Sequence, residues 1–286
     1  MKPILFVPLV LVLAILACSI PTLPTPTEPP TVEPPPVTEP PTTESPTAEP
    51  SPTTEPTAAT NLTCNELSLL LDPALASGYD CQVIPANTEL EIYPTHTRLT
   101  LHGYPLGDKF FEPHIEAYAV ADYRLLSPET VNEKVSRLQT LTGGAPAPIF
   151  DSSFSVSLPF LPIVNAGQVF FSNYQVVPFT NGSGIRFLTE YAQYFAPVNN
   201  HDLFYTYQGL TADGAYWVAA ILPINHPMLP ANADTPPNGM RWEQFSENYG
   251  PYITDMVNQL NAQSPASFIP TLTALDALVA SIVIQP

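Results

Sequence analysis

The sequence predicts an α+β fold in which an antiparallel β-sheet is covered by helices. Three observations indicate it. Four runs rich in β-branched and aromatic residues follow one another between residues 167 and 224. Two of their connections contain Asn or Asp beside Gly, as β-hairpin turns do. Segments in which apolar residues recur at helical spacing lie before and after these runs.

The strand-like runs occupy residues 167–179, 185–195, 203–210 and 215–224. TNGSG separates the first two and TADG the last two, so we expect a four-stranded antiparallel meander over about 167–224. The last run is apolar on both faces, which is typical of a central strand covered on both sides. Less regular strand patterns precede the meander at 66–71, 82–85, 98–103 and 114–121.

Three helical regions are predicted. The first, near 128–141, opens with the sequence SPE and ends before a glycine. The second, at 242–261, contains a Gly-Pro pair at 250–251, where we expect a break. The third, at 270–280, is rich in leucine and leads into a short final strand near 281–284. These helices are expected to cover the sheet.

The first 60 residues have a different composition from the rest. Lys2 precedes an apolar run shorter than the roughly 20 residues that cross a bilayer, so a signal peptide over 1–17 is favoured over a permanent transmembrane helix. Residues 21–60 are mostly Pro, Thr and Glu, which predicts a disordered, extended stalk; a glycosylated mucin-like stalk is the alternative. We expect residues 61–286 to form a single globular ectodomain.

The sequence ILAC at residues 15–18 resembles the lipobox of bacterial lipoproteins. The resemblance implies that residues 1–17 are removed and that Cys18 is diacylated, for example with palmitate. It also implies that residues 18–60 form a lipidated cysteine followed by the stalk. Two acyl chains are what stable membrane anchoring requires. The expected location is therefore extracytoplasmic, at the bacterial cell membrane, with membrane lipid as the partner of Cys18.

Two cysteines remain if Cys18 carries lipid. Outside the cytoplasm a disulfide between Cys64 and Cys81 can persist, and we expect one. The alternative is two free, buried thiols.

The order of elements, with its leucine-rich closing helix and short terminal strand, resembles the α-β-α sandwich of PsbP and Mog1-type proteins. The phrases SLPFLPIVNAGQVFF, NGSGIRFLTEYAQ and LFYTYQGLTADGAYWVAAILPI resemble uncharacterised secreted bacterial lipoproteins. These resemblances imply fold and location, and they imply no catalytic activity.

Charge excludes one class of partner. The chain has 26 acidic and 8 basic residues and a net charge of −18, so it repels phosphate backbones and we expect no nucleic-acid binding. The sequence has no glycine-rich phosphate loop and no nucleophile elbow, and we expect no cofactor.

The densest group of possible metal ligands consists of His102, Glu112, His114 and Glu116. On a strand the last three would share one face, which can present a nitrogen and two carboxylates to a metal. Pro113 interrupts that strand, and acidic residues that face water are the alternative. We therefore assign no metal.

Arg186, Glu190 and Gln208 are candidate binding residues. Arg186 and Glu190 share one face of a predicted strand, where an arginine can pair with an anion. The favoured interpretation is a structural ion pair under a covering helix or loop. His201 and Asp202 are assigned to a solvated loop.

The aromatic residues of the two hairpins, which include Tyr191 and Tyr194, are assigned mainly to the core of the sheet. Stacking of their rings on a sugar or a peptide is the alternative. The long connection at 225–239 is the expected rim of a binding site.

The expected function is that of a non-enzymatic ectodomain, which binds an envelope protein, a glycan or another ligand. One alternative is a hydrolase that acts on envelope substrates through paired carboxylates drawn from Glu112, Glu116, Asp122 and Glu190. The other is a structural component of an envelope complex.

Overall fold

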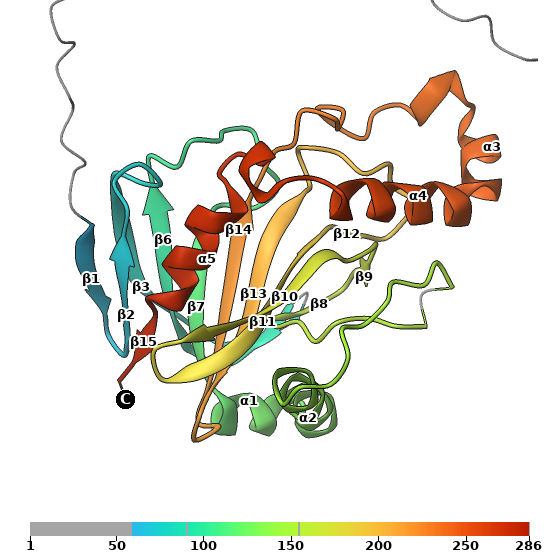
Figure 1. Ribbon diagram of the computed structural model, residues 1–286. Coiled ribbons are helices and arrows are strands. Elements are labelled where there is room, and N and C mark those ends of the chain that lie inside the picture. Colours follow the sequence, from blue (N-terminus) through green and yellow to red (C-terminus); the bar gives the residue numbers. More distant parts are fainter. Residues whose placement is uncertain (1–58, 90, 154, 286) are drawn as a thin grey trace, which may run out of the picture. The chain divides into compact units, whose positions relative to one another are not determined.

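A seven-stranded antiparallel β-sheet forms the centre of the computed structural model, which describes residues 59–286 except 90, 154 and 286 (Figure 1). The α+β class with an antiparallel sheet is confirmed. The strand order is β10-β11-β13-β14-β7-β6-β3. In chain order these strands are β3 (Gly78–Ile84), β6 (His96–His102), β7 (His114–Ala119), β10 (Ser172–Phe179), β11 (Gly182–Thr189), β13 (Phe204–Thr211) and β14 (Tyr216–Pro223).

The predicted signal peptide at 1–17, the lipidation site Cys18 and nearly all of the stalk lie outside the described residues. All described elements belong to one compact unit.

The region predicted as a meander is more complex than four strands in series. β10, β11, β13 and β14 are neighbours in the sheet, but the chain leaves the sheet between β11 and β13. There it forms β12 (Tyr191–Ala192), which pairs with β9 (Gly167–Gln168) in a separate two-stranded sheet. The predicted strands at 167–179 and 185–195 are therefore each split in two. The register shift between β10 and β11 coincides with the positive φ of Asn173.

Two predicted hairpin turns join neighbouring strands of this sheet. In the turn between β13 and β14, Gly214 has a φ of 72°, and the carboxylate of Asp213 accepts hydrogen bonds from the Thr211 hydroxyl and the Ala215 amide. In β11 a Cβ atom at Gly184 would lie 2.6 Å from the ring of Tyr207. Glycine is required there because the Tyr207 ring lies against the strand, with its hydroxyl bonded to the Val177 carbonyl.

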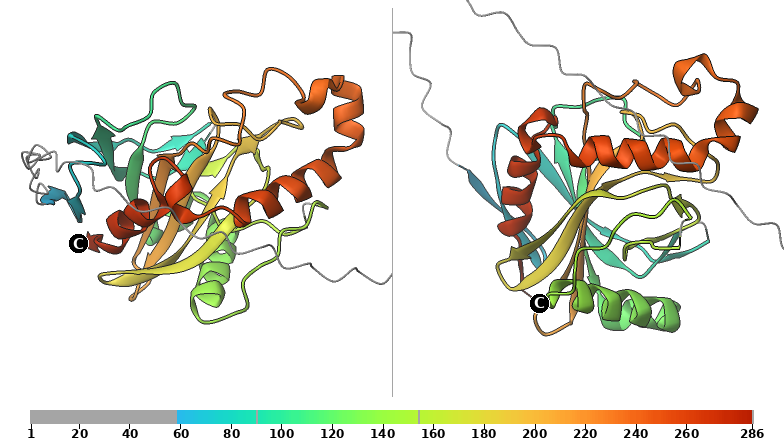
Figure 2. Two further views of the ribbon diagram at one scale, coloured as in Figure 1. Left: turned by 45° about the horizontal axis from the view of Figure 1, so that its top comes forward. Right: turned by 45° about the vertical axis from the view of Figure 1, so that its right-hand side comes forward.

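Helices cover both faces of the sheet (Figures 1 and 2). α1 (Val120–Leu126) and α2 (Pro128–Thr142) pack on one face, and α4 (Tyr249–Asn261) and α5 (Leu272–Ala280) pack on the other. The side chains of β13 alternate between the two cores, with Tyr205 and Tyr207 on the α4–α5 side and Phe204 and Leu210 on the α1–α2 side. The sheet is thus a central layer that is buried on both faces.

Helix ends follow local sequence, with two corrections. α2 begins at Pro128 as predicted, whereas the strand predicted to reach residue 121 ends at Ala119. Val120 and Tyr123, three residues apart, are buried on α1 instead.

The region at 242–261 breaks at Asn248, between α3 (Trp242–Glu247) and α4, rather than at the Gly-Pro pair, which falls in the first turn of α4. Proline is tolerated there because the first amides of a helix need no intrahelical acceptor.

Smaller elements complete the described part. β1 (Thr60–Cys64), β2 (Leu67–Leu71) and β15 (Val283–Ile284) form one three-stranded sheet, and β4 (Asn87–Thr88), β5 (Glu91–Tyr93) and β8 (Ile163–Val164) form another. Two short 3₁₀ helices are η1 (Pro237–Gly239) and η2 (Pro265–Ser267). A disulfide joins Cys64 of β1 to Cys81 of β3, so the predicted pair is present.

Candidate functional site

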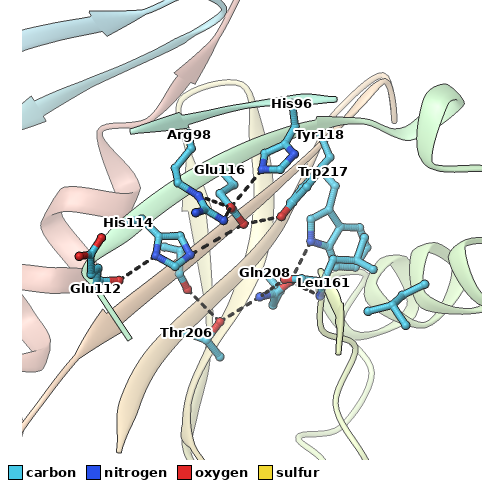
Figure 3. A network of polar contacts seen from close by, with 12 residues as sticks. His96, Arg98, Glu112, His114, Glu116, Tyr118, Leu161, Thr206, Gln208 and Trp217 are labelled. Carbon is cyan, nitrogen blue, oxygen red and sulfur yellow. Dashed lines mark hydrogen bonds and ion pairs between the residues drawn. The ribbon is translucent and has the colours of Figure 1, made fainter. Parts of the chain in front are cut away.

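Two of the candidate metal ligands, His114 and Glu116, lie in a buried network of polar side chains (Figure 3). Both project from β7 on the same face as Tyr118, which belongs to the core under α1 and α2. Arg98 of β6 is the cross-strand partner of Glu116, and His96 lies two residues before it on the same strand. Strand pairing therefore assembles this network.

The carboxylate of Glu116 is fully paired. Its Oε1 accepts a hydrogen bond from Arg98 Nε at 2.6 Å and lies 3.1 Å from His96 Nε2. Its Oε2 accepts a hydrogen bond from the Tyr118 hydroxyl. Burial alone would raise the pKa of Glu116, but His114, His96 and Arg98 outweigh burial and lower that pKa to about 2. Glu116 is therefore ionised at neutral pH, and its partners are structural.

The other metal candidates lie elsewhere. His102 is at the exposed end of β6, where its Nε2 is 3.0 Å from Asp80 Oδ2. The side chain of Glu112 is exposed, and its carbonyl oxygen lies 2.7 Å from His114 Nδ1. Asp122, a carboxylate of the hydrolase hypothesis, is exposed on α1. Within residues 59–286, apart from the three that are not described, no group of three or more His, Cys, Asp or Glu side chains is placed to hold a metal ion.

Arg186 makes a structural ion pair. Its guanidinium lies under α5, where Nε is 3.1 Å from Asp276 Oδ1, and it also donates to Gln175 Oε1 at 2.7 Å. The carbonyl oxygen of Asn173 accepts a further hydrogen bond from it. These partners hold the guanidinium within the fold, as the favoured interpretation of a structural ion pair expects.

Gln208 faces the opposite side of the sheet from Arg186. Its Oε1 accepts hydrogen bonds from the Leu161 amide at 2.9 Å and from Trp217 Nε1 at 2.8 Å (Figure 3). Its Nε2 donates to Thr206 Oγ1 at 2.9 Å. Gln208 thus anchors the irregular segment 158–162 to the sheet. Phe160 of that segment lines a cleft together with Glu190.

Glu190 lines a cleft of about 470 Å³, which we call the acidic cleft. Three carboxyl side chains, three phenylalanines and two tyrosines from five separate segments of the chain border it. They are Glu91, Glu190 and Asp202, with Phe110, Phe111, Phe160, Tyr191 and Tyr194. Most of the remaining wall is made of short apolar side chains and the amides of Asn165 and Gln193. A concave site with aromatic walls and a few convergent polar groups is the usual form of a ligand pocket.

Glu190 directly follows β11 and is buried. Its Oε1 accepts a hydrogen bond from the Asn199 amide at 2.8 Å, whereas Oε2 is buried with no hydrogen-bond partner among the described residues. Burial raises the pKa of Glu190 well above its ordinary value, and the carboxylate of Asp202 adds to the increase. The Asn199 hydrogen bond and Lys109 oppose it. Burial and Glu116 also raise the pKa of Glu91, so two carboxyl groups of the cleft favour their neutral forms, Glu190 most strongly.

Asn199 ties the second carboxyl group to the first. Its side-chain amide donates to Asp202 Oδ2 at 2.8 Å while its backbone amide binds Glu190. Asp202 Oδ1 lies 2.7 Å from His201 Nδ1. The predicted loop carries His201 and Asp202 with half-buried side chains, and it also places Asp202 at the cleft.

A second hollow of about 740 Å³, the apolar groove, adjoins the acidic cleft. The two share seven lining residues, which include Phe160, Tyr191, Ala192 and Tyr194. The long connection at 225–239, predicted as a binding rim, contributes no lining residue to either hollow.

Sequence reasoning singled out Glu190 but missed Glu91, Phe110 and Phe111. Phe110 and Phe111 lie two and one residues before Glu112, in a segment for which the sequence predicts possible metal ligands. Two consecutive phenylalanines within an irregular polar segment were the available signal. No sequence signal indicated Glu91, because β5 has three residues and shows no periodicity.

Replacing Glu190 with Gln is expected to stabilise the protein at mildly alkaline pH by about 1 to 3 kcal/mol, because it removes a charge that burial and Asp202 disfavour in the folded state. A carboxyl whose folded-state pKa is raised holds its proton more tightly when folded. Wild-type stability should therefore fall as pH rises above the ordinary glutamate pKa, and the Gln variant should lack that decline. Urea unfolding across this pH range, with Glu112→Gln as the exposed control, measures the difference. Parallel pH profiles for wild type and Glu190→Gln would contradict the assignment.

No protein-family model matches this chain, and no curated protein matches it in sequence. None of the helices in the part of the chain that the structure describes has the length and apolarity needed to cross a membrane.

Proposed function

We propose that this protein is a lipid-anchored, extracytoplasmic protein of the bacterial envelope whose ectodomain binds a small ligand in the acidic cleft. The observation that carries the binding proposal is Glu190, a buried carboxyl group in a ligand-sized cleft with one oxygen that no described residue hydrogen-bonds. Such a group lowers stability, and ionisable groups held in unfavourable states occur preferentially at functional sites.

The proposed location depends on the amino-terminal sequence. The lipobox-like ILAC motif supports acylation of Cys18, and the Pro/Thr/Glu-rich residues 21–60 support a spacer between the membrane and an ectodomain at 61–286. The Cys64–Cys81 disulfide agrees with an oxidising compartment. The net charge of −18 argues against a nucleic-acid partner.

The finer fold assignment is also a proposal. Helices on both faces of an antiparallel sheet support the resemblance to the α-β-α sandwich of PsbP and Mog1-type proteins. In that assignment β10, β11, β13 and β14 represent the central meander, and β12 is an excursion that builds the ligand site.

Replacing Cys18 with Ser should move the protein from the membrane fraction to the soluble extracytoplasmic fraction, because the acyl chains are the proposed anchor. Fractionation of cells that express each form, followed by mass spectrometry of the amino-terminal peptide, measures this. A Cys64→Ser variant is the matched control and should stay with the membrane if it is folded. An intact Met1 on the wild-type protein, or an unmodified Cys18 thiol, would contradict the anchor.

Ligand binding is tested with three probes of similar shape and different charge: choline, 3,3-dimethylbutan-1-ol and 3,3-dimethylbutanoate. At least one should raise the melting temperature of the wild-type protein, because a ligand that binds only the folded state stabilises it. It should not stabilise an Ala192→Trp variant, whose indole fills the space beside Tyr191. Circular dichroism checks that the variant is folded. Absence of a shift with all three probes would overturn the binding proposal.

A second candidate function is a hydrolase of envelope glycans, favoured by the three carboxyl groups that line one cleft. A neutral Glu190 suits a general acid, and Asp202 would be the second carboxylate. Release of reducing sugar from envelope glycan by the wild type and not by Glu190→Gln would favour this function. A structural role in an envelope complex would be indicated by loss of complex assembly in cells while the cleft variants behave normally.

A further inference from the structure

We infer that the acidic cleft recognises an organic cation, specifically a quaternary ammonium group of the choline type. This inference rests on the proposed function and names the chemical class of its ligand. Three features of the cleft support it: the charge of its lining, its aromatic walls and the existing hydrogen bonds of its carboxyl groups.

The charge of the cleft has one sign. Glu91, Glu190 and Asp202 border it, and no lysine or arginine is among its lining residues. Two cations outside the lining act on its carboxyl groups, Lys109 on Glu190 and Asp202 and Arg98 on Glu91. Lys109 donates to the carbonyl oxygens of Asn200 and Ile224 and to the side chain of Asn225, and Arg98 is paired with Glu116. Lys109 therefore offsets part of the negative charge, and the lining residues themselves present carboxyl groups without a lysine or arginine to an entering cation.

The walls are aromatic. Phe160 and Tyr191 lie with their ring centroids 4.6 Å apart, and Phe110 stands edge-on to Phe111 at 4.8 Å. Phe110 is 64% exposed and Tyr194 is 60% exposed, so these two rings offer surface that the fold does not cover. Aromatic faces attract cations, and cages of such rings are the typical binding sites for quaternary ammonium groups.

The pairing of the carboxyl groups selects the kind of cation. Asp202 accepts from Asn199 through one oxygen and contacts His201 through the other, and Glu190 uses one oxygen for the Asn199 amide. Asp202 therefore supplies charge more readily than a full set of hydrogen-bond acceptors, and Glu190 does so once a cation in the cleft favours its ionised form. A primary ammonium group needs three acceptors, whereas a quaternary one needs none. A metal ion would need several oxygen ligands, and the described residues present no such group.

The state of Glu190 agrees with a cationic ligand. Burial and Asp202 both disfavour its charged form, and a cation in the cleft would offset both effects. Because the ligand favours the ionised carboxyl group, its affinity should increase as pH rises. The groups that act on Glu190 are Asp202, which disfavours ionisation, and Lys109 together with the Asn199 amide, which favour it.

Isothermal titration calorimetry of the wild-type protein tests the inference directly. Choline should bind at least about tenfold more tightly than its neutral isostere 3,3-dimethylbutan-1-ol, and 3,3-dimethylbutanoate should bind most weakly. Asp202→Asn and Glu190→Gln should each weaken choline binding by roughly tenfold and leave binding of the neutral isostere unchanged. Glu112→Gln, which removes a carboxyl group outside the cleft, should bind choline as the wild type does.

The possible results separate the two proposals. Equal affinity for choline and the neutral isostere would overturn the cation inference and leave the ligand-binding proposal intact. Loss of binding for both probes in the variants, with native circular dichroism, would also overturn it, since charge would then not be what the substitutions removed. No binding of any probe would overturn both proposals.

A further arm identifies the source of the ammonium group. The Cys18→Ser protein, which lacks the proposed acyl chains, is sedimented with vesicles of phosphatidylcholine or of phosphatidylglycerol. Binding to the first alone, reversed by free choline, would support recognition of a lipid headgroup. Binding of choline in solution without sedimentation would support a free ligand.

Discussion

Replacing Glu116 with Gln is expected to lower the free energy of unfolding by about 3 to 5 kcal/mol at neutral pH, the usual effect of removing one partner from a buried charge pair. The substitution keeps the shape of the side chain and removes its charge. Arg98, which Glu116 contacts through both Nε and Nη2, would lose its carboxylate partner. The Tyr118 hydroxyl would face an amide in place of a carboxylate.

The stabilisation that Glu116 provides depends on pH. The pKa of Glu116 is lowered to about 2 on folding, so its contribution is fully present above the ordinary glutamate pKa. That contribution is lost as pH falls toward 2. The stability difference between wild type and Glu116→Gln should therefore shrink steadily in acid. Urea unfolding at several pH values measures it.

Glu112→Gln is the matched control, because it makes the same substitution four residues away at an exposed position. Its stability should stay close to that of the wild type, as for most exposed substitutions. If Glu116→Gln and Glu112→Gln lowered the free energy of unfolding equally, the ion pairs and hydrogen bonds of Glu116 would not stabilise the fold.

Removing the disulfide should have the second largest effect. A Cys64→Ala, Cys81→Ala double variant is expected to lose about 3 kcal/mol, because the bridge closes a loop between residues 17 apart and restricts the unfolded chain. The bridge also joins β1 of a small sheet to β3 at the edge of the main sheet. Loss of protection from amide exchange should therefore be greatest in β1 and β2.

Reductant provides the control for this prediction. It should destabilise the wild-type protein to the level of the double variant and leave the variant itself unchanged. A wild-type protein that is insensitive to reductant under unfolding conditions, and no more stable than the variant, would show that the bridge is not formed.

Much of the fold could be predicted because its signals are local. Hairpin turns at Asn181 and Gly214, the two apolar faces of β14 and the start of α2 at Pro128 are all encoded within a few residues. The end of β7 was placed too late, because Val120 is compatible with a strand as well as with the helix it begins. The splitting of the run at 185–195 was missed for a different reason. It depends on the pairing of β12 with β9, more than 20 residues earlier.

The candidate site was less predictable, because it is assembled from distant segments. Glu190 was grouped with Arg186 by strand alternation, but β11 ends at Thr189 and alternation stops there. Arg186 therefore lies under α5, and Glu190 enters the acidic cleft. Glu91 and Phe110 reach the same cleft from positions 99 and 80 residues before Glu190 in the chain. Periodicity within one segment of the sequence does not predict which distant segments meet in the fold.

The most direct test of the central claim is a crystal structure of the purified protein with (2-bromoethyl)trimethylammonium, a choline analogue whose bromine is located by anomalous scattering. The cation inference predicts a bromine peak at the acidic cleft, with the trimethylammonium group against Tyr194 and Phe110 and facing Asp202. A crystal saturated with the analogue in which the accessible cleft is empty, or in which the ammonium group points away from the carboxyl groups, would contradict it.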